Sequence, residues 1–436
     1  MRIGFHVINL EENYLVKEKH RLLSIKKEIN QILPEIDTDI LSLNKLQLDG
    51  YINIGNWFHF CLTNKIIRKL FINRLSPQLI VFFYKLILFL NYKKVMKHYF
   101  EKNKYDYVFI WSDASFNEEL VISQYVKTLC IQFTMNTSNT NELVRWFKYE
   151  REKHQKKAWL IEKLTQASQY RCFGELYGPH GGNYINHLVM KLLNILPEGE
   201  RMGMGKSSAV FVMGDKFKDE FIKLGVPKEK IHIGGALSYS KIFDLKPNFM
   251  IEEKKIVTIF LQNIKKNDDL LFGNYDFYNS LSILLNQVKN TLNNNVIFYF
   301  KLHPKELHSP FLEEFFQSFS VAYKVFKQGS VSNYDLIYSS DLNITMCSTV
   351  GIDTMLLKKP LLSFNFGILL PDFLKYICKD IFVDSPENSA TYIEKIFKNH
   401  EFKNTIIEKA YSDVQHFVNI QSNVVKKMLM VLKNNA

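Results

Sequence analysis

The stretch FYFKLHPKE, Phe298 to Glu306, carries side chains whose types and spacing suit anion chemistry. Its apolar part predicts a buried strand. An imidazole between two ammonium groups suits a phosphate, because both groups donate charge-assisted hydrogen bonds. The same residues also fit a packed histidine at a strand end. The strand ends in Lys301, His303, Pro304 and Lys305.

A second stretch, LNITMCSTVG (342–351), ends a predicted strand in hydroxyl groups and opens a predicted helix. The hydroxyls of Ser348 and Thr349, and the free N–H groups at such a helix start, suit a phosphate oxygen. Either residue taken alone is equally typical of a helix N-cap. Two such segments at the carboxyl ends of two strands favour a shared site, since ligands of open α/β sheets collect at that edge.

Strand-like and helix-length segments alternate through the later part of the chain, which predicts a doubly wound parallel sheet. The apolar runs lack a period of two, as expected for strands that are covered on both faces. The predicted strands are 256–263, 296–304, 321–326, 342–349 and 360–366, and the predicted helices are 274–292, 311–319, 332–339 and 351–357.

The first half shows the same alternation less clearly, and the segment 237–255 separates the halves. We therefore predict an α/β protein of two Rossmann-like domains that face a cleft, at 1–240 and 241–436. The last helix is expected to pack back on the N-terminal domain. Predicted strands of the first half are 2–9, 39–44, 107–113, 129–134, 209–214 and 231–236, with a charged helix at 141–168.

Length and composition limit the classes of protein. The chain has 436 residues, of which 47% are hydrophobic and 23% charged, so it is globular and large enough for two or three domains. Its five cysteines form no C-x-x-C pair, which indicates neither a disulfide framework nor a zinc site and fits a reducing cytoplasm. The net charge of +12 suits an acidic partner, yet no zinc-finger spacing or RNA-binding signature supports nucleic acid.

One segment, Leu79 to Lys97, is apolar and has basic flanks. Its unbroken apolar parts are shorter than the roughly 20 residues that span a bilayer, and Lys85 interrupts them. The segment fits either a buried core helix or a helix that lies on an anionic membrane surface. With no secretory signal pattern at the N-terminus, we expect a cytoplasmic protein, with peripheral attachment at the inner face of the membrane as the second possibility.

The stretches KLHPKE (301–306) and SSDLNITMCSTVGIDTMLLKKPLL (339–362) resemble the C-terminal domain of GT-B-fold glycosyltransferases that build bacterial surface polysaccharides. The resemblance is especially to capsule β-Kdo transferases and bacterial sialyltransferases, with their HP and later SS/ST motifs. CDP-glycerol polymerases share similar elements. The stretch 211–236 is similar to the end of the N-terminal domain in that superfamily, and the whole resemblance covers roughly residues 205–370.

The resemblance implies a transferase that moves a sugar, first of all a CMP-activated nonulosonic acid or Kdo, from a nucleotide donor to a glycan or glycolipid of the capsule or lipopolysaccharide. His303 would be catalytic at the leaving phosphate. Asp353 departs from the family pattern, in which many enzymes carry a Glu that binds the nucleotide ribose. The implied donor-binding residues are Gln262, Lys265, Lys301, Pro304, Ser348, Thr349, Gly351 and Asp353.

No metal or cofactor is expected, because a lone acidic pair such as Asp268-Asp269 is typical of a solvated loop. Transfer does need a base for the acceptor hydroxyl. Asp113, after the predicted strand 107–113, is the first candidate, although it equally suits a helix N-cap. Other candidates on the acceptor side are Glu118, Glu119, Glu175 and, in the glycine-rich loop GPHGG, His180.

Other functions remain open at this point. A transferase of the same fold would use a UDP-sugar or CDP-glycerol. A UDP-GlcNAc 2-epimerase-like enzyme shares the two-domain fold but needs several catalytic carboxylates and no acceptor. In a non-catalytic binding protein, the same residues would only cap helices.

Overall fold

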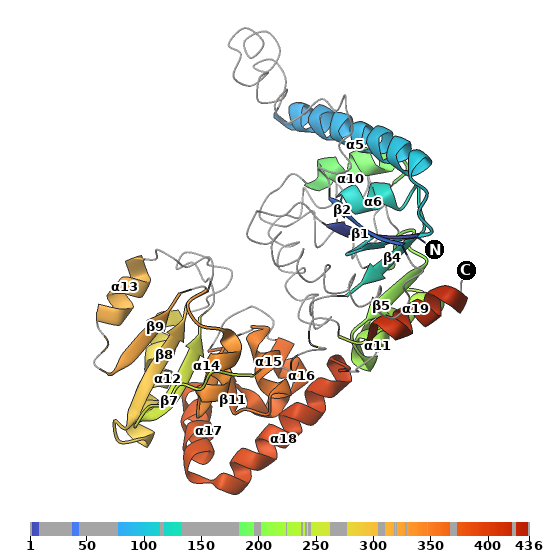
Figure 1. Cartoon of the computed structure of the whole chain (residues 1–436). Coiled ribbons are helices and arrows are strands. Elements are labelled where there is room, and N and C mark those ends of the chain that lie inside the picture. The colour runs from blue at the N-terminus through green and yellow to red at the C-terminus, as the bar shows by residue number, and fades with distance from the viewer. Residues whose placement is uncertain are drawn as a thin grey trace. The chain divides into compact units, whose positions relative to one another are not determined.

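Two compact units make up the computed structural model of the chain (Figure 1). Described residues up to Ala236 and from Val424 onward belong to the first unit, and Tyr239 to Ile420 belong to the second. The structure describes residues 2–7, 37–42, 77–113, 117–132, 183–195, 202–223, 225–236, 239, 242, 246–261, 277–303, 310–317, 319, 321–327, 329–346, 348–366, 373–420 and 424–434.

The first unit is built on a six-stranded sheet with the order β2-β1-β3-β4-β5-β6, in which all neighbouring strands are parallel. The short strands β3, β4 and β5 are buried at every position, because helices cover both faces of such a sheet. The strands are β1 (Arg2–Val7), β2 (Asp37–Ser42), β3 (Tyr107–Ile110), β4 (Thr128–Ile131), β5 (Ala209–Val212) and β6 (Ile231–Ile233).

Figure 1 shows three helices of this unit, α5, α6 and α10, together on one side of the sheet, and α19 beside β5 and α11. The helix α19 packs closely, since a Cβ atom on Gly234 would lie 3.5 Å from Cγ of Met428. The helices are α5 (Pro77–Lys102), α6 (Asn117–Ile122), α10 (Asn183–Leu192), α11 (Asp215–Lys223) and α19 (Val424–Asn434), with a 3₁₀ turn at Lys228–Lys230.

The second unit holds another all-parallel sheet of six strands, in the order β12-β11-β10-β7-β8-β9. All six residues of β8 are buried, so its aromatic run forms the centre of the core. At the sheet edge, β9 is largely exposed. The strands are β7 (Lys255–Phe260), β8 (Val296–Lys301), β9 (Tyr323–Phe326), β10 (Leu342–Thr345), β11 (Leu361–Phe364) and β12 (Phe382–Val383).

Side-chain caps begin several helices of the second unit. Ser332 accepts a hydrogen bond from the amide of Asp335 at the start of α14, and Asn399 accepts one from Phe402 at the start of α18. The helices are α12 (Phe277–Thr291), α13 (Pro310–Gln317), α14 (Asn333–Ser339), α15 (Val350–Leu356), α16 (Phe373–Ile377), α17 (Pro386–Lys398) and α18 (His400–Phe417), with a 3₁₀ turn at Lys379–Ile381.

The predicted α/β class with two Rossmann-like units is confirmed. Every predicted strand has a counterpart, usually shorter at its carboxyl end, and the charged helix predicted at 141–168 lies outside the described residues. The segment 79–97 lies within α5, whose inner face is buried while its outer face is exposed. Among the helices that the structure describes, none has the length and hydropathy needed to cross a bilayer.

Candidate functional site

The strand order of the second unit places a topological switch point between β7 and β10. After β7 the chain adds β8 and β9 on one side, and it then returns to place β10 on the other side of β7. Helices leaving the two strands diverge at such a point, which opens a crevice outside their carboxyl ends. The expected ligand site of this unit therefore lies beyond the last residues of β7 and β10.

The carboxyl ends of these strands are aligned. Phe260 of β7 is in register with Thr345 of β10 on one side and with Lys301 of β8 on the other. His303 follows β8 by two residues and Ser348 follows β10 by three, so both predicted motifs leave the same edge of the sheet. One strand separates them, which corresponds to about 10 Å and suits a ligand larger than a single phosphate.

The hydroxyl pair after β10 is accessible. Thr349 occupies the N-cap position of α15, yet its side chain makes no capping hydrogen bond and is exposed. The Oγ atom of Ser348 accepts a long hydrogen bond, 3.4 Å, from the amide of Val350. Thr349 therefore does not cap α15 with its side chain, whereas the bond that Ser348 accepts is of the capping type, so the N-cap interpretation still applies to Ser348.

Gly351 and Asp353 lie in the first turns of α15. A Cβ atom on Gly351 would come within 2.5 Å of Cδ1 of Leu374 on α16, so any larger residue here would require the Leu374 side chain to shift. Asp353 is half-buried, and its backbone carbonyl accepts from the amide of Leu357 at the end of the helix. The role of either residue toward a donor stays a prediction.

Lys301 and His303 lie at the end of β8. The ammonium group of Lys301 is nearly buried and donates to the carbonyl oxygens of Lys327 and Val331, at 2.9 and 2.7 Å. It thus holds the loop between β9 and α14, which leaves the same sheet edge. His303 is half-buried just beyond the strand.

Several predicted residues lie outside the part of the chain that the structure describes. They are Gln262, Lys265 and Pro304 from the donor side and Glu175 and His180 from the acceptor side. Glu118 lies on α6, but its side chain is likewise not described.

Asp113, the candidate base, is fully buried in the first unit. Its two carboxylate oxygens accept backbone hydrogen bonds from Gly203 at 2.6 Å and Ser207 at 2.9 Å. A Cβ atom on Gly205 would lie 2.2 Å from the carbonyl oxygen of Asp113, so the loop 203–207 packs directly on this residue. These contacts make Asp113 an anchor for the loop, and its role as a base remains a prediction.

Glu119 is also fully buried, and its carboxylate accepts from the amides of Trp111 and Ser112, both at 2.8 Å. It thereby satisfies two backbone N–H donors where β3 ends.

Burial raises the pKa of the Cys130 thiol on β4 well above its usual range, with a further contribution from Asp113. This thiol therefore stays protonated and is not a nucleophile at neutral pH.

Sequence reasoning missed the loop 203–207 as a partner of Asp113 and overlooked Gln132, the residue after β4. The paired glycines of GMG were a usable signal for the loop, because closely packed backbone requires them. Gln132 is buried and accepts from the amide of Met213 at 3.0 Å, while its Nε2 atom has no partner among the described residues. No sequence pattern identified it.

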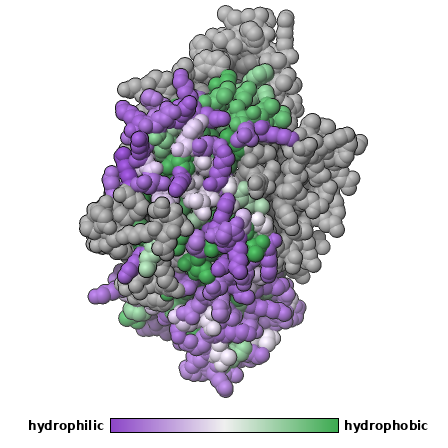
Figure 2. Space-filling model, turned by 90° about the vertical axis from the view of Figure 1, so that its right-hand side faces the viewer, coloured by the Kyte–Doolittle hydropathy of each residue, from purple (hydrophilic) through white to green (hydrophobic). Residues whose placement is uncertain are grey.

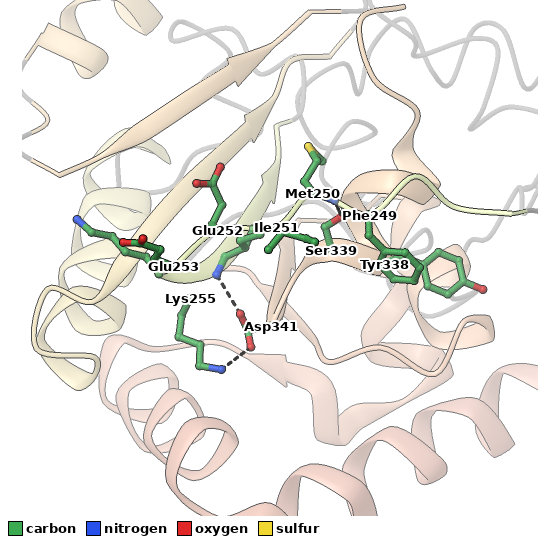
Figure 3. Close-up of a pocket in the computed structure, with 11 residues that line it drawn as sticks. Phe249, Met250, Ile251, Glu252, Glu253, Lys255, Tyr338, Ser339 and Asp341 are labelled. Atoms are coloured by element: carbon green, nitrogen blue, oxygen red, sulfur yellow. Dashed lines mark hydrogen bonds and ion pairs between the residues drawn. The ribbon is translucent and has the colours of Figure 1, made fainter.

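A pocket of about 480 Å³ lies at the opposite, amino-terminal edge of the second sheet (Figure 3). Its polar groups bind one another: Lys255 pairs with Asp341 at 2.9 Å, and Ser339 accepts from the amide of Met250 at 2.9 Å. Glu252 on its rim binds Tyr299 and Lys324. These paired groups hold the segment before β7 in place.

Within the described residues, no group of three or more His, Cys, Asp or Glu side chains gathers as metal ligands do. The described groups of the candidate site are the Ser348 and Thr349 hydroxyls, the His303 imidazole and backbone groups at the carboxyl edge of the second sheet.

We compared the chain with known proteins to find which of them share this architecture. No protein-family model matches the sequence, and no curated protein matches it. Solved structures do match. A UDP-GlcNAc 2-epimerase from Neisseria meningitidis, bound to UDP-GlcNAc, is 11% identical, with 100% of both chains covered and a TM-score of 0.55. A UDP-GlcNAc 2-epimerase from Methanocaldococcus jannaschii is 12% identical over 100% of both chains, with a TM-score of 0.54.

A glycosyltransferase from Rickettsia africae is 14% identical and covers 99% of this chain and 98% of its own, with a TM-score of 0.50. At these identities the likeness shows the fold. The chain is thus a two-domain α/β protein of the GT-B type, a fold that occurs both in sugar-nucleotide epimerases and in glycosyltransferases.

Proposed function

We propose that the chain is an enzyme that binds a nucleotide-activated sugar at the carboxyl edge of its second sheet and transfers the sugar to a glycan or glycolipid acceptor. The observation that carries this proposal is the alignment of the β7, β8 and β10 ends, with His303 and the Ser348–Thr349 pair leaving one edge at the switch point. Such an edge binds nucleotides in other doubly wound sheets.

Each residue has a role in this proposal. The imidazole of His303 donates a hydrogen bond to the departing phosphate, and the exposed Thr349 hydroxyl donates a second. Negative charge develops on that phosphate as the bond to the sugar breaks, so fixed donors stabilise the transition state more than the bound substrate. Lys301 acts indirectly, because it holds the β9–α14 loop.

The donor nucleotide is the finer part of the proposal. The sequence motifs resemble enzymes that use CMP-linked sugars, whereas the similar structures are those of UDP-GlcNAc enzymes, so the comparisons give no support to CMP in particular. A thermal-shift series with CMP, CDP, UDP and GDP separates these cases, because a ligand that binds only the folded protein raises its stability. A ligand at about 100 times its Kd adds about 2.7 kcal/mol.

An epimerase that acts on a UDP-sugar is the second candidate, favoured by the likeness over the full length of two such enzymes. The two reactions differ in their need for an acceptor. An epimerase changes the configuration of the free sugar nucleotide by itself, whereas a transferase releases the nucleotide and requires a second substrate. Incubation with UDP-GlcNAc alone, followed by NMR of the sugar, distinguishes them.

Two sets of variants test the site. His303→Ala and the Ser348→Ala/Thr349→Ala double change should each lower turnover about a hundredfold, because losing one fixed donor to developing charge costs about 3 kcal/mol. Matched controls are His416→Ala and Ser412→Ala, both on exposed positions of α18. Turnover near the wild-type rate in the first set, or equal losses in the controls, would place the site elsewhere.

A further inference from the structure

The outer face of α5 carries a continuous stripe that nothing in the proposed chemistry uses. Phe83, Ile87 and Leu90 are 49%, 39% and 49% exposed, although they are large apolar side chains. Their spacing of four and three residues puts them on one face of the helix, one above the other. The same spacing continues into two exposed lysines, Lys94 and Lys97. The stripe therefore begins apolar and ends in two lysines, of which Lys97 also pairs with Glu101 on the same helix at 3.8 Å.

The opposite face of α5 explains the orientation of the stripe. Phe89, Tyr92, Met96, Tyr99 and Phe100 are buried and anchor the helix to the first unit. The helix also contacts α10, and Lys93 donates to the carbonyl oxygen of Leu193, the residue after α10, at 3.3 Å. The helix is thus fixed in rotation by its buried face, and the stripe cannot turn inward without breaking this packing.

In the upper part of Figure 2, at the height that α5 has in Figure 1, green hydrophobic residues lie next to purple hydrophilic ones. A neighbouring apolar side chain, Leu192 at the end of α10, is 62% exposed. Exposed apolar groups that are rimmed by cations are the pattern of a helix that lies in the headgroup region of a bilayer, with apolar side chains in the acyl boundary and lysines at the phosphates.

We propose that the α5 stripe, Phe83, Ile87, Leu90, Lys94 and Lys97, is a docking surface for an anionic lipid bilayer. Charge complementarity favours this occupant over a second copy of the chain, because each copy carries a net charge of +12 and would repel the other. Among the described side chains of α5, the apolar part has three members, whereas a stable protein interface buries about 800 Å² on each partner.

The stripe binds the membrane surface without crossing it. The apolar side chains supply the hydrophobic contribution to binding, and the lysines supply an electrostatic contribution of about fivefold in affinity each, equivalent to roughly 1 kcal/mol per cation near an anionic surface. The electrostatic part depends on salt, because the Debye length falls from about 10 Å at 0.1 M to about 3 Å at 1 M. The proposal does not depend on which reaction the second unit catalyses.

Vesicle co-sedimentation with the full chain tests this surface. The probes are vesicles of phosphatidylcholine with phosphatidylglycerol and vesicles of phosphatidylcholine alone. The wild-type protein should bind the anionic vesicles, bind the neutral ones far less, and dissociate as salt is raised. Lys94→Gln/Lys97→Gln should weaken binding about 30-fold, following the contribution of each lysine. Phe83→Gln/Ile87→Gln/Leu90→Gln should abolish sedimentation at low salt as well.

Matched controls come from elsewhere in the chain. Phe249→Gln/Ile251→Gln removes two apolar side chains that are more exposed, 63% and 92%, but lie beside Glu252 and Glu253. Lys216→Gln/Lys223→Gln removes two exposed lysines of α11. Neither control should change vesicle binding, and thermal unfolding should show that all variants are folded.

Three results would overturn the proposal. One is an absence of binding to anionic vesicles at low salt. Another is an equal loss of binding in the control variants. The third is a wild-type dimer in sedimentation velocity that the triple glutamine change converts to a monomer, since this would assign the stripe to a second copy of the chain.

Discussion

Asp113 accepts a hydrogen bond of 2.9 Å from the backbone amide of Ser207, 94 residues further along the chain. With the bond from Gly203, it ties the end of β3 to the loop that leads into β5. A buried carboxylate that holds two amides is a strong local constraint, because both donors would otherwise be buried without partners.

Replacing this carboxylate separates its two possible roles. Asp113→Asn puts an NH₂ group opposite one backbone N–H, so we expect a loss of about 2 to 3 kcal/mol in unfolding free energy. Chemical denaturation measures this loss, with Asp219→Asn on the exposed side of α11 as the control. A variant of unchanged stability whose turnover collapses would instead support Asp113 as the base and contradict the anchoring role.

Lys301 offers a second test within the candidate site. Lys301→Met keeps the length of the side chain but leaves the carbonyls of Lys327 and Val331 without their donor. We expect a lower melting temperature, a loss of about 1 to 3 kcal/mol, and a smaller thermal shift with the nucleotide that stabilises the wild type. Lys254→Met, at an exposed position before β7, should change neither quantity. An unaltered nucleotide shift in Lys301→Met would remove the β9–α14 loop from the site.

At the contact of α15 with α16, we expect one added methyl group to lower the stability of the fold. Gly351→Ala places a Cβ atom 2.5 Å from Leu374, and overpacking of this kind costs about 1 to 3 kcal/mol. A double-mutant cycle with Leu374→Ala gives the matched control, since the alanine at 351 should cost less once the leucine is shortened. Additive losses in the cycle would show that the clash is relieved in another way.

His232 on β6 predicts a pH dependence of stability. Burial, with a contribution from Lys218, lowers the pKa of this imidazole below its usual value of 6.5. The unfolded chain therefore binds the proton more readily, so the contribution of His232 is fully present above about pH 6.5 and is lost as the pH falls through the folded pKa. As the pH is lowered from about 8 to 5, the melting temperature of His232→Gln should fall less steeply than that of the wild type or of His416→Gln.

The fold class followed from the sequence because parallel strands buried on both faces leave a local pattern. Runs such as Val296 to Lys301 lack a period of two, and helix-length segments separate them, which is enough to predict a doubly wound sheet. The segments after β8 and β10 that form the candidate site were also visible, since the motif residues adjoin the strands that position them. These properties depend on neighbours in the chain and need no tertiary information.

The roles of individual side chains were decided by contacts between residues far apart in sequence. The strand pattern placed Asp113 at a sheet edge, but only the folded chain brings Gly203 and Ser207 to its carboxylate. In the same way, the exposure of Phe83, Ile87 and Leu90 depends on which face of α5 the rest of the first unit covers. Burial and hydrogen bonding at long range are set by packing, so the sequence determined which groups are present and the tertiary structure decided which remain accessible.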